Sequence, residues 1–176
     1  MHRTIKLVAL LLFLCSTAIA QEVPRIEVFG GYSHLISNLN ATSFNLNGGT
    51  VAVSENANRW FGGTLDFTSH WATEGGYKVN TQTLMYGPVF SYRKQPRLTP
   101  FSHILMGVVR GSGGYLGTSQ ASRHFGLMLG GGVDFALTDR IAIRPIQADY
   151  LMSRFLGTRQ DNIRLSAGIV LRFGGR

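Results

Sequence analysis

The chain has 176 residues, of which 44% are hydrophobic, and it carries 17 lysine and arginine residues against 9 aspartate and glutamate residues. This length suits a single domain. The net charge of +8 would suit an anionic partner, but the basic residues are scattered and no RNA- or DNA-binding motif is present, so we exclude nucleic acid. The three lysines, Lys6, Lys78 and Lys94, are few for a protein whose whole surface meets water.

Residues 1–20 have the pattern of a secretory signal peptide. Arg3 and Lys6 precede an apolar run that ends at Leu14, and small residues lead to the sequence "AIA". Basic, apolar and small residues in this order precede a cleavage site, and the apolar run is too short to span a membrane as a helix. We therefore expect a mature protein of residues 21–176 that forms one domain.

Eight segments of alternating hydrophobicity follow, without a convincing helical period. The predicted strands are Arg25–Ile36, Gly48–Ser54, Trp60–Trp71, Thr81–Arg93, Leu98–Arg110, Arg123–Ala136, Ile141–Leu151 and Asn162–Phe173. The connections alternate between long polar loops (37–47, 72–80, 111–122, 152–161) and short turns (55–59, 94–97, 137–140). Antiparallel strands with long loops at one end and tight turns at the other are typical of outer-membrane barrels.

The last predicted strand shows its two faces clearly. Its apolar positions are Ile163, Leu165, Ala167, Ile169, Leu171 and Phe173, and they alternate with Arg164, Ser166, Gly168, Val170 and Arg172. Successive side chains of a strand point to opposite faces, so one face is apolar and the other is mostly small or charged. The apolar face meets lipid in a membrane barrel, whereas it would line the cavity of a soluble, lipocalin-like barrel.

The polar face favours the membrane alternative. Over the predicted strands it carries seven charged side chains: Glu27, Asp66, Arg93, Asp134, Asp149, Arg164 and Arg172. We expect them to form a charge network in the lumen, where opposite charges pair and side chains fill a narrow interior. The sequence therefore predicts an all-β, eight-stranded antiparallel up-and-down transmembrane β-barrel.

Pro88 and Pro145 lie inside predicted strands. Pro88 and Pro145 each lose a ladder hydrogen bond, so we expect a β-bulge at both positions. Arg144 and Asp149 have opposite parity in one strand, which fits a change of phase at Pro145. The segment Leu98–Arg110 is apolar on both faces, so the pattern leaves its register open.

Five short stretches resemble a known group of proteins. The stretches are "EVFGGYSH", "YGPVFSYR", "GGGVDFAL", "IQADYL" and "SAGIVLRF". They are similar to the OmpA-like and OmpX-like eight-stranded barrels and, more closely, to the outer membrane protein beta-barrel domain family of Gram-negative bacteria. The resemblance covers nearly the whole mature chain. It implies a location in the bacterial outer membrane, with membrane lipid and lipopolysaccharide as partners.

The same resemblance implies an assembly signal in the last strand. Family members end in a pattern of polar, glycine, hydrophobic and aromatic residues that the barrel-assembly machinery reads during insertion. Here Ser166, Gly168, Leu171 and Phe173 match that pattern. This chain departs from it by three further residues, 174–176, after the aromatic residue.

The sequence carries little sign of catalytic or metal chemistry. The histidines outside the signal are His34, His70, His103 and His124. They form no His-x-His or Glu-x-x-His pair, so we expect neither a metal nor another cofactor. His34 and Ser37 loosely resemble a motif of barrel lipid A deacylases, but residues three apart in a strand point to opposite faces. Cys15, the single cysteine, lies in the signal, so the mature chain has no thiol.

We therefore expect a non-enzymatic, monomeric outer-membrane protein with a structural or surface-interaction role. A narrow diffusion pore is the first alternative, and a lipid A-modifying hydrolase ranks below it. The basic residues near the long loops, Lys78, Arg123, Arg154 and Arg159, are placed to meet phosphates of the outer leaflet. The sequence does not indicate what else the loops bind or whether the lumen conducts.

Overall fold

The computed structural model describes residues 23–39, 42–74, 77–115, 118–155 and 158–174. The strands are β1 (Ile26–Leu39), β2 (Thr42–Asn56), β3 (Phe61–Glu74), β4 (Tyr77–Ser91), β5 (Leu98–Tyr115), β6 (Thr118–Ala136), β7 (Ile141–Phe155) and β8 (Thr158–Phe173). Over these described ranges, no helix is long and apolar enough to cross a membrane. The predicted signal peptide lies outside the described residues.

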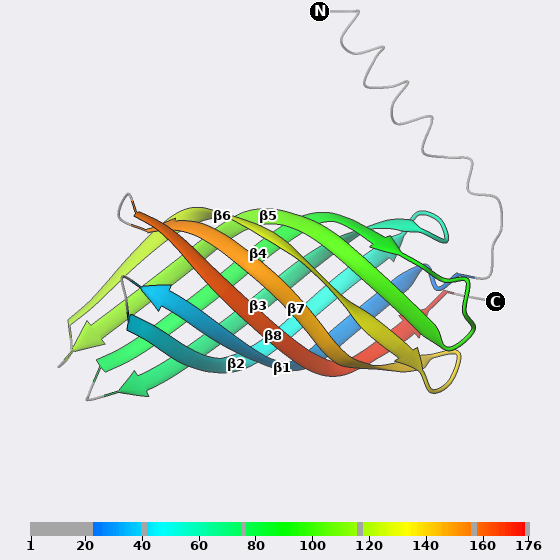
Figure 1. Ribbon diagram of the computed structural model, residues 1–176, viewed down its shortest axis with the longest axis horizontal. Coiled ribbons are helices and arrows are strands. Elements are labelled where there is room, and N and C mark those ends of the chain that lie inside the picture. The colour runs from blue at the N-terminus through cyan, green and yellow to red at the C-terminus, as the bar shows by residue number, and fades with distance from the viewer. Residues whose placement is uncertain (1–22, 40–41, 75–76, 116–117, 156–157, 175–176) are drawn as a thin grey trace, which may run out of the picture.

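The strands form a closed antiparallel barrel. Each strand pairs with its neighbours in the chain, and β1 closes the barrel by pairing with β8, with Glu27 opposite Arg172 and Ser33 opposite Ser166. The start of β1 and the end of β8 lie at the same end of the barrel, together with the three connections that follow β2, β4 and β6 (Figure 1). We call this the turn end and the opposite end the hairpin end.

The long loops predicted at the hairpin end are wrong, because the strands continue through most of those residues. Leu39 still pairs with Thr42, and Tyr115 pairs with Thr118. Near this end the outward positions become polar as well, for example at Asn45 and Asn47 of β2. The contrast between the two faces is therefore lost while the ladder of hydrogen bonds continues, and a polar strand resembles a loop in sequence.

The outer face of the barrel is apolar over a continuous band. Exposed side chains there include Val51, Val53, Leu65, Phe67, Leu84, Ile104, Met106, Leu129, Ile146, Ile169 and Leu171. Along β8, the outward residues from Phe173 to Ile163 are all apolar. At a rise of roughly 3.3 Å per residue and a tilt of roughly 40°, this stretch spans about 25 Å, the height of the apolar band of membrane barrels.

Pro88 and Pro145 affect the pairing of their strands differently. The register of β7 shifts between Arg144 and Gln147 against β8, so the bulge predicted at Pro145 is confirmed. The bulge predicted at Pro88 is wrong, because the pairing of β4 with β5 has the same register on either side of this residue. Pro88 loses its own N–H donor without an extra residue being inserted into the strand. The register left open for the fifth strand is also resolved, with Phe101, His103 and Leu105 pointing inward.

Candidate functional site in the barrel lumen

Arg164 of β8 lies in the lumen between carboxylates from two other strands. Its two terminal nitrogens donate to the Oδ1 and Oδ2 atoms of Asp66 on β3 at 2.7 and 3.0 Å. Its Nε donates to Oδ2 of Asp149 on β7 at 2.8 Å. All three side chains are buried, with side-chain exposures of 0–2%. We call these three residues the central cluster, and it connects strands from across the barrel.

Neighbouring side chains complete the hydrogen bonding of the central cluster. Nε2 of His103 lies 2.8 Å from Oδ1 of Asp149, and the Gln147 amide donates to Oδ2 of Asp149 at 2.9 Å. The absence of a side chain at Gly130 makes room for this arrangement, because a Cβ atom there would lie 2.0 Å from Oδ1 of Asp149. The Asp149 carboxylate thus has three partners in a lumen where an unpaired charge would be costly.

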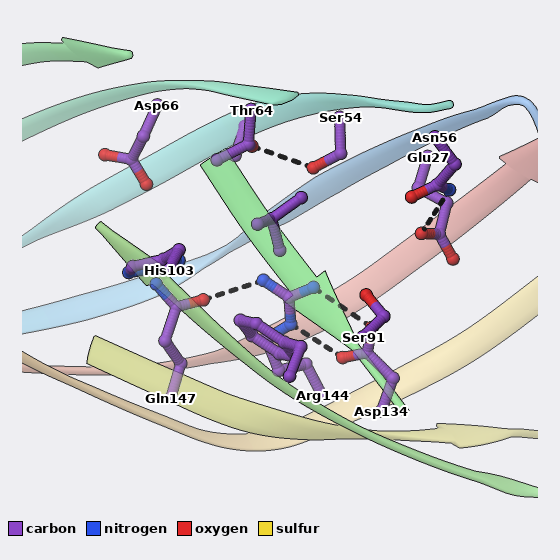
Figure 2. A pocket seen from close by; sticks show the side chains of 13 residues that line it. Glu27, Ser54, Asn56, Thr64, Asp66, Ser91, His103, Asp134, Arg144 and Gln147 are labelled. Carbon is purple, nitrogen blue, oxygen red and sulfur yellow. Dashed lines mark hydrogen bonds and ion pairs between the residues drawn. The ribbon is translucent and has the colours of Figure 1, made fainter. Parts of the chain in front are cut away.

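Arg144 extends the network towards the turn end (Figure 2). Its guanidinium donates to both carboxylate oxygens of Asp134, at 2.7 and 3.0 Å, and to Oε1 of Gln147 at 2.7 Å. The rings of Phe29 and Phe101 lie 4.2 and 4.1 Å from its central carbon. The cation therefore has both ion-pair and cation–π contacts, and Gln147 links it to the central cluster.

A second cluster lies at the turn end and has the opposite charge balance. Arg93 donates to Oε2 of Glu27 at 2.7 Å, and Nε of Arg172 donates to Oε1 at 3.0 Å. Asn56 donates to Glu27 at 3.0 Å and accepts from Arg93 at 3.1 Å. We call Glu27, Arg93 and Arg172 the turn-end cluster. Two arginines share one carboxylate there, and each has about 10% of its side chain exposed.

The space between these groups is small. A cavity of about 20 Å³ lies among Glu27, Asp66, His103, Asp134 and Arg144, with other side chains completing its wall (Figure 2). Such a volume holds roughly one water molecule. A further apolar cluster of Met85, Leu105, Val109, Met128 and Leu151 fills part of the lumen. Side chains therefore fill much of the lumen at this level.

The structure places all seven charged residues singled out from the sequence on the inner face of the barrel. It divides them between the central cluster, the turn-end cluster and the Asp134–Arg144 pair. Arg144 and His103 also belong to the network, although neither was predicted from the sequence. The signal for Arg144 was the bulge at Pro145, which turns this residue inward. His103 gave no such signal, because the fifth strand is apolar on both faces.

The residues matching the assembly signal are divided between the two faces of β8. Ser166 points inward and is 4% exposed, whereas Leu171 and Phe173 point outward with 42% and 51% exposure. Gly168 pairs with Gly31 across the seam that closes the barrel. The outward residues could thus be reached from the membrane side, while Ser166 belongs to the lumen.

The histidines lie apart from one another. His34 is on the outer face, where Nδ1 lies 2.9 Å from Oδ1 of Asn47, and Ser37 is on the inner face. His70 is buried, with Nε2 at 2.9 Å from Oγ of Ser33, and its Nδ1 has no hydrogen-bond partner. Among the described residues, no group of three or more histidine, cysteine, aspartate or glutamate side chains could hold one metal ion.

An eight-stranded closed barrel with an apolar outer band and a charged, filled interior defines a transmembrane barrel of the bacterial outer membrane. Residues 7–173 match the family described as "Outer membrane protein beta-barrel domain", and the chain belongs to this family. A search of curated protein sequences finds no significant match.

Solved structures of three outer-membrane proteins share the fold. Neisserial surface protein A is 16% identical, with a TM-score of 0.74 over 84% of this chain and 97% of its own. Ail, the attachment invasion locus protein of Yersinia pestis, is 17% identical, with a TM-score of 0.61 over 85% and 99%. OprG of Pseudomonas aeruginosa is 9% identical, with a TM-score of 0.56 over 89% and 99%. At these identities the similarity concerns the fold.

Proposed function

We propose that this barrel serves the outer membrane through its wall and its outward-facing end, in a structural or surface-binding role, and that it neither conducts solutes nor catalyses a reaction. The observation that carries this proposal is the central cluster. Arg164 joins Asp66 and Asp149 with buried, charge-assisted hydrogen bonds, and Arg144 and the apolar side chains occupy the space beside it. A lumen held closed by such contacts leaves the surface as the functional part.

Two serine–histidine pairs in the described part of the chain bear on the hydrolase alternative, and neither supports it. Ser33 and His70 are in contact, yet both are at most 1% exposed, and Nδ1 of His70 has no carboxylate to orient the ring. His34 and Ser37 lie on opposite faces of β1. Neither pair offers a serine that is both activated and open to a lipid substrate.

The proposed partners are membrane lipid, including lipopolysaccharide, around the apolar band, and the barrel-assembly machinery during insertion. The match of the last strand to the assembly pattern supports the second partner. Replacing Phe173 with alanine should lower the amount of folded barrel in the outer membrane, and replacing Tyr92, another exposed aromatic residue at the turn end, should lower it less.

Conductance in planar lipid bilayers tests the closed lumen. We expect folded protein to give no stable current steps. A triple variant with Arg164→Ser, Asp66→Ser and Asp149→Ser removes the central cluster without leaving an unpaired charge, so it should conduct more than the parent. Large, stable steps from the parent protein would instead establish the narrow pore.

A further inference from the structure

Two arginines face each other on the outside of the barrel near its hairpin end. Arg110 of β5 and Arg123 of β6 are partners in the strand register, and both are exposed. On the other side of Arg110, its partner is Gln82 of β4. Cross-strand partners share a face of the sheet, so these three side chains form one row on the outer wall.

This row stands at the edge of the apolar band. Towards the turn end, the next outward pairs on β5 and β6 are apolar: Val108 with Phe125, Met106 with Leu127, and Ile104 with Leu129. The stretch from Leu98 to Arg110 rises about 30 Å, at roughly 3.3 Å per residue and a tilt of roughly 40°. That height equals the thickness of the hydrocarbon core, so the row lies at the level of lipid headgroups.

Within the described part of the chain, no carboxylate balances the positive charge of the row. The lumen arginines donate to carboxylates at 2.7–3.0 Å, whereas no described carboxylate forms an ion pair with Arg110 or Arg123. Like charges directly opposite each other destabilise a sheet. An anion bound between the two guanidinium groups would remove this repulsion, and guanidinium groups bind phosphate oxygens in a bidentate manner.

The hairpin end is the outer side of the membrane in this fold. Both ends of the described barrel lie at the turn end (Figure 1). At the hairpin end the strands continue past the apolar band as polar hairpins, for example beyond Arg110 to Tyr115, and the longer segments of outer-membrane barrels face the outside of the cell. Phosphates at the level of Arg110 and Arg123 therefore belong to lipid of the outer leaflet.

We propose that Arg110 and Arg123, assisted by the Gln82 amide, form a binding site for a phosphate group of lipid A, the membrane anchor of lipopolysaccharide. This inference rests on the proposed surface role. It specifies the class of ligand and the place on the outer wall where the ligand binds. The site is independent of the lumen, because its three side chains lie on the opposite face of the sheet from the central cluster.

Binding of lipid A to the folded, full barrel in neutral detergent tests this site. Native mass spectrometry counts bound lipid, and migration before and after boiling verifies folding. We expect Arg110→Gln with Arg123→Gln to weaken binding of bisphosphorylated lipid A about tenfold or more, because charge-assisted hydrogen bonds are lost. The matched control is Arg97→Gln with Arg140→Gln, two exposed arginines at the turn end, which should bind like the parent.

Further probes separate the possible sources of phosphate. Lipid A without its phosphates and phosphatidylglycerol should both bind the parent more weakly than bisphosphorylated lipid A. If both double variants lose lipid A binding to the same extent, the net charge of the protein alone accounts for binding, and the proposal is overturned. Equal binding of dephosphorylated lipid A, or displacement by inorganic phosphate at the lipid's own concentration, would overturn it too. If the parent barrel conducts ions and the Arg110→Gln, Arg123→Gln variant still loses lipid A binding, the closed lumen is refuted but the lipid A site is supported.

Discussion

The central cluster and the turn-end cluster have opposite surplus charges. In the central cluster one arginine lies between two carboxylates, and no side chain is more than 2% exposed. In the turn-end cluster one carboxylate lies between two arginines, each about 10% exposed. Nε, Nη1 and Nη2 of Arg164 are all bonded, whereas Nε of Arg93 and Nη2 of Arg172 are buried without a partner.

This difference shows how depth within the lumen sets the pairing that a charge requires. Removing an ion from water costs several kcal/mol unless a partner and further hydrogen bonds compensate for it. The deep cluster meets this demand through His103, Gln147 and Thr68 around its two carboxylates. The turn-end cluster, nearer to the mouth, contains a surplus positive charge and unbonded N–H groups.

Replacing Arg164 with methionine should have the largest effect. Methionine approximates the length of arginine but leaves Asp66 and Asp149 buried without a cation, so we expect the free energy of unfolding to fall by about 3–5 kcal/mol. Urea titration of the barrel in lipid vesicles measures this change. The fluorescence of Trp60 and Trp71, both on the exposed outer surface, reports on the loss of lipid contact.

A compensated variant distinguishes charge from shape in this experiment. Adding Asp66→Asn and Asp149→Asn to Arg164→Met removes the unpaired charges and should restore much of the lost stability, since neutral replacements of buried ion pairs are often tolerated. If the triple variant is as unstable as the single one, packing rather than charge pairing holds the centre of the lumen together.

Replacing Glu27 with glutamine should have a smaller effect, although it breaks both ion pairs of the turn-end cluster. We expect a loss of about 2 kcal/mol, the size of a charge-assisted hydrogen bond, because water at the mouth can solvate the two arginines. Glu55→Gln is the matched control. Its carboxylate is 68% exposed and lies 3.7 Å from Arg25, so it should change stability by less than about 0.5 kcal/mol. A loss from Glu27→Gln as large as that from Arg164→Met would show that depth does not matter.

Much of this arrangement follows from the alternation of side chains in the strands. Glu27, Asp66 and Arg164 could be assigned to the inner face because each sits among residues of clear parity. Strand number, order and antiparallel pairing followed from the same pattern together with the spacing of the turns. The closing pair β1–β8 needs no separate sequence signal, because a barrel has no free edge.

The remaining features depend on tertiary structure. Whether a proline inserts a bulge is decided by the neighbouring strands, so Pro88 and Pro145 look alike in sequence and behave differently. His103 is surrounded by apolar residues on both sides of its strand, and only its contact with Asp149 reveals its inward direction. The pairing of Arg110 with Arg123 depends on a register between two strands that sequence periodicity does not fix.

The smallest effect is expected from Arg172→Gln, which removes the surplus charge of the turn-end cluster. Arg172 makes one hydrogen bond to Glu27, at 3.0 Å, while Arg93 keeps its shorter bond of 2.7 Å in the variant. The lost bond is offset by relief of the repulsion between two arginines and by removal of a buried N–H without a partner. We therefore expect stability to change by no more than about 1 kcal/mol, in either direction. Urea titration under the same conditions as for Glu27→Gln measures this change.

The matching variant in the central cluster is Asp149→Asn. It also removes the surplus charge of its cluster, but it leaves His103 and Arg164 with a weaker hydrogen-bond acceptor in a buried site. Asp149→Asn should lower the free energy of unfolding more than Arg172→Gln does. Equal losses would mean that the two clusters differ in the sign of their surplus charge but not in how strictly that charge must be paired.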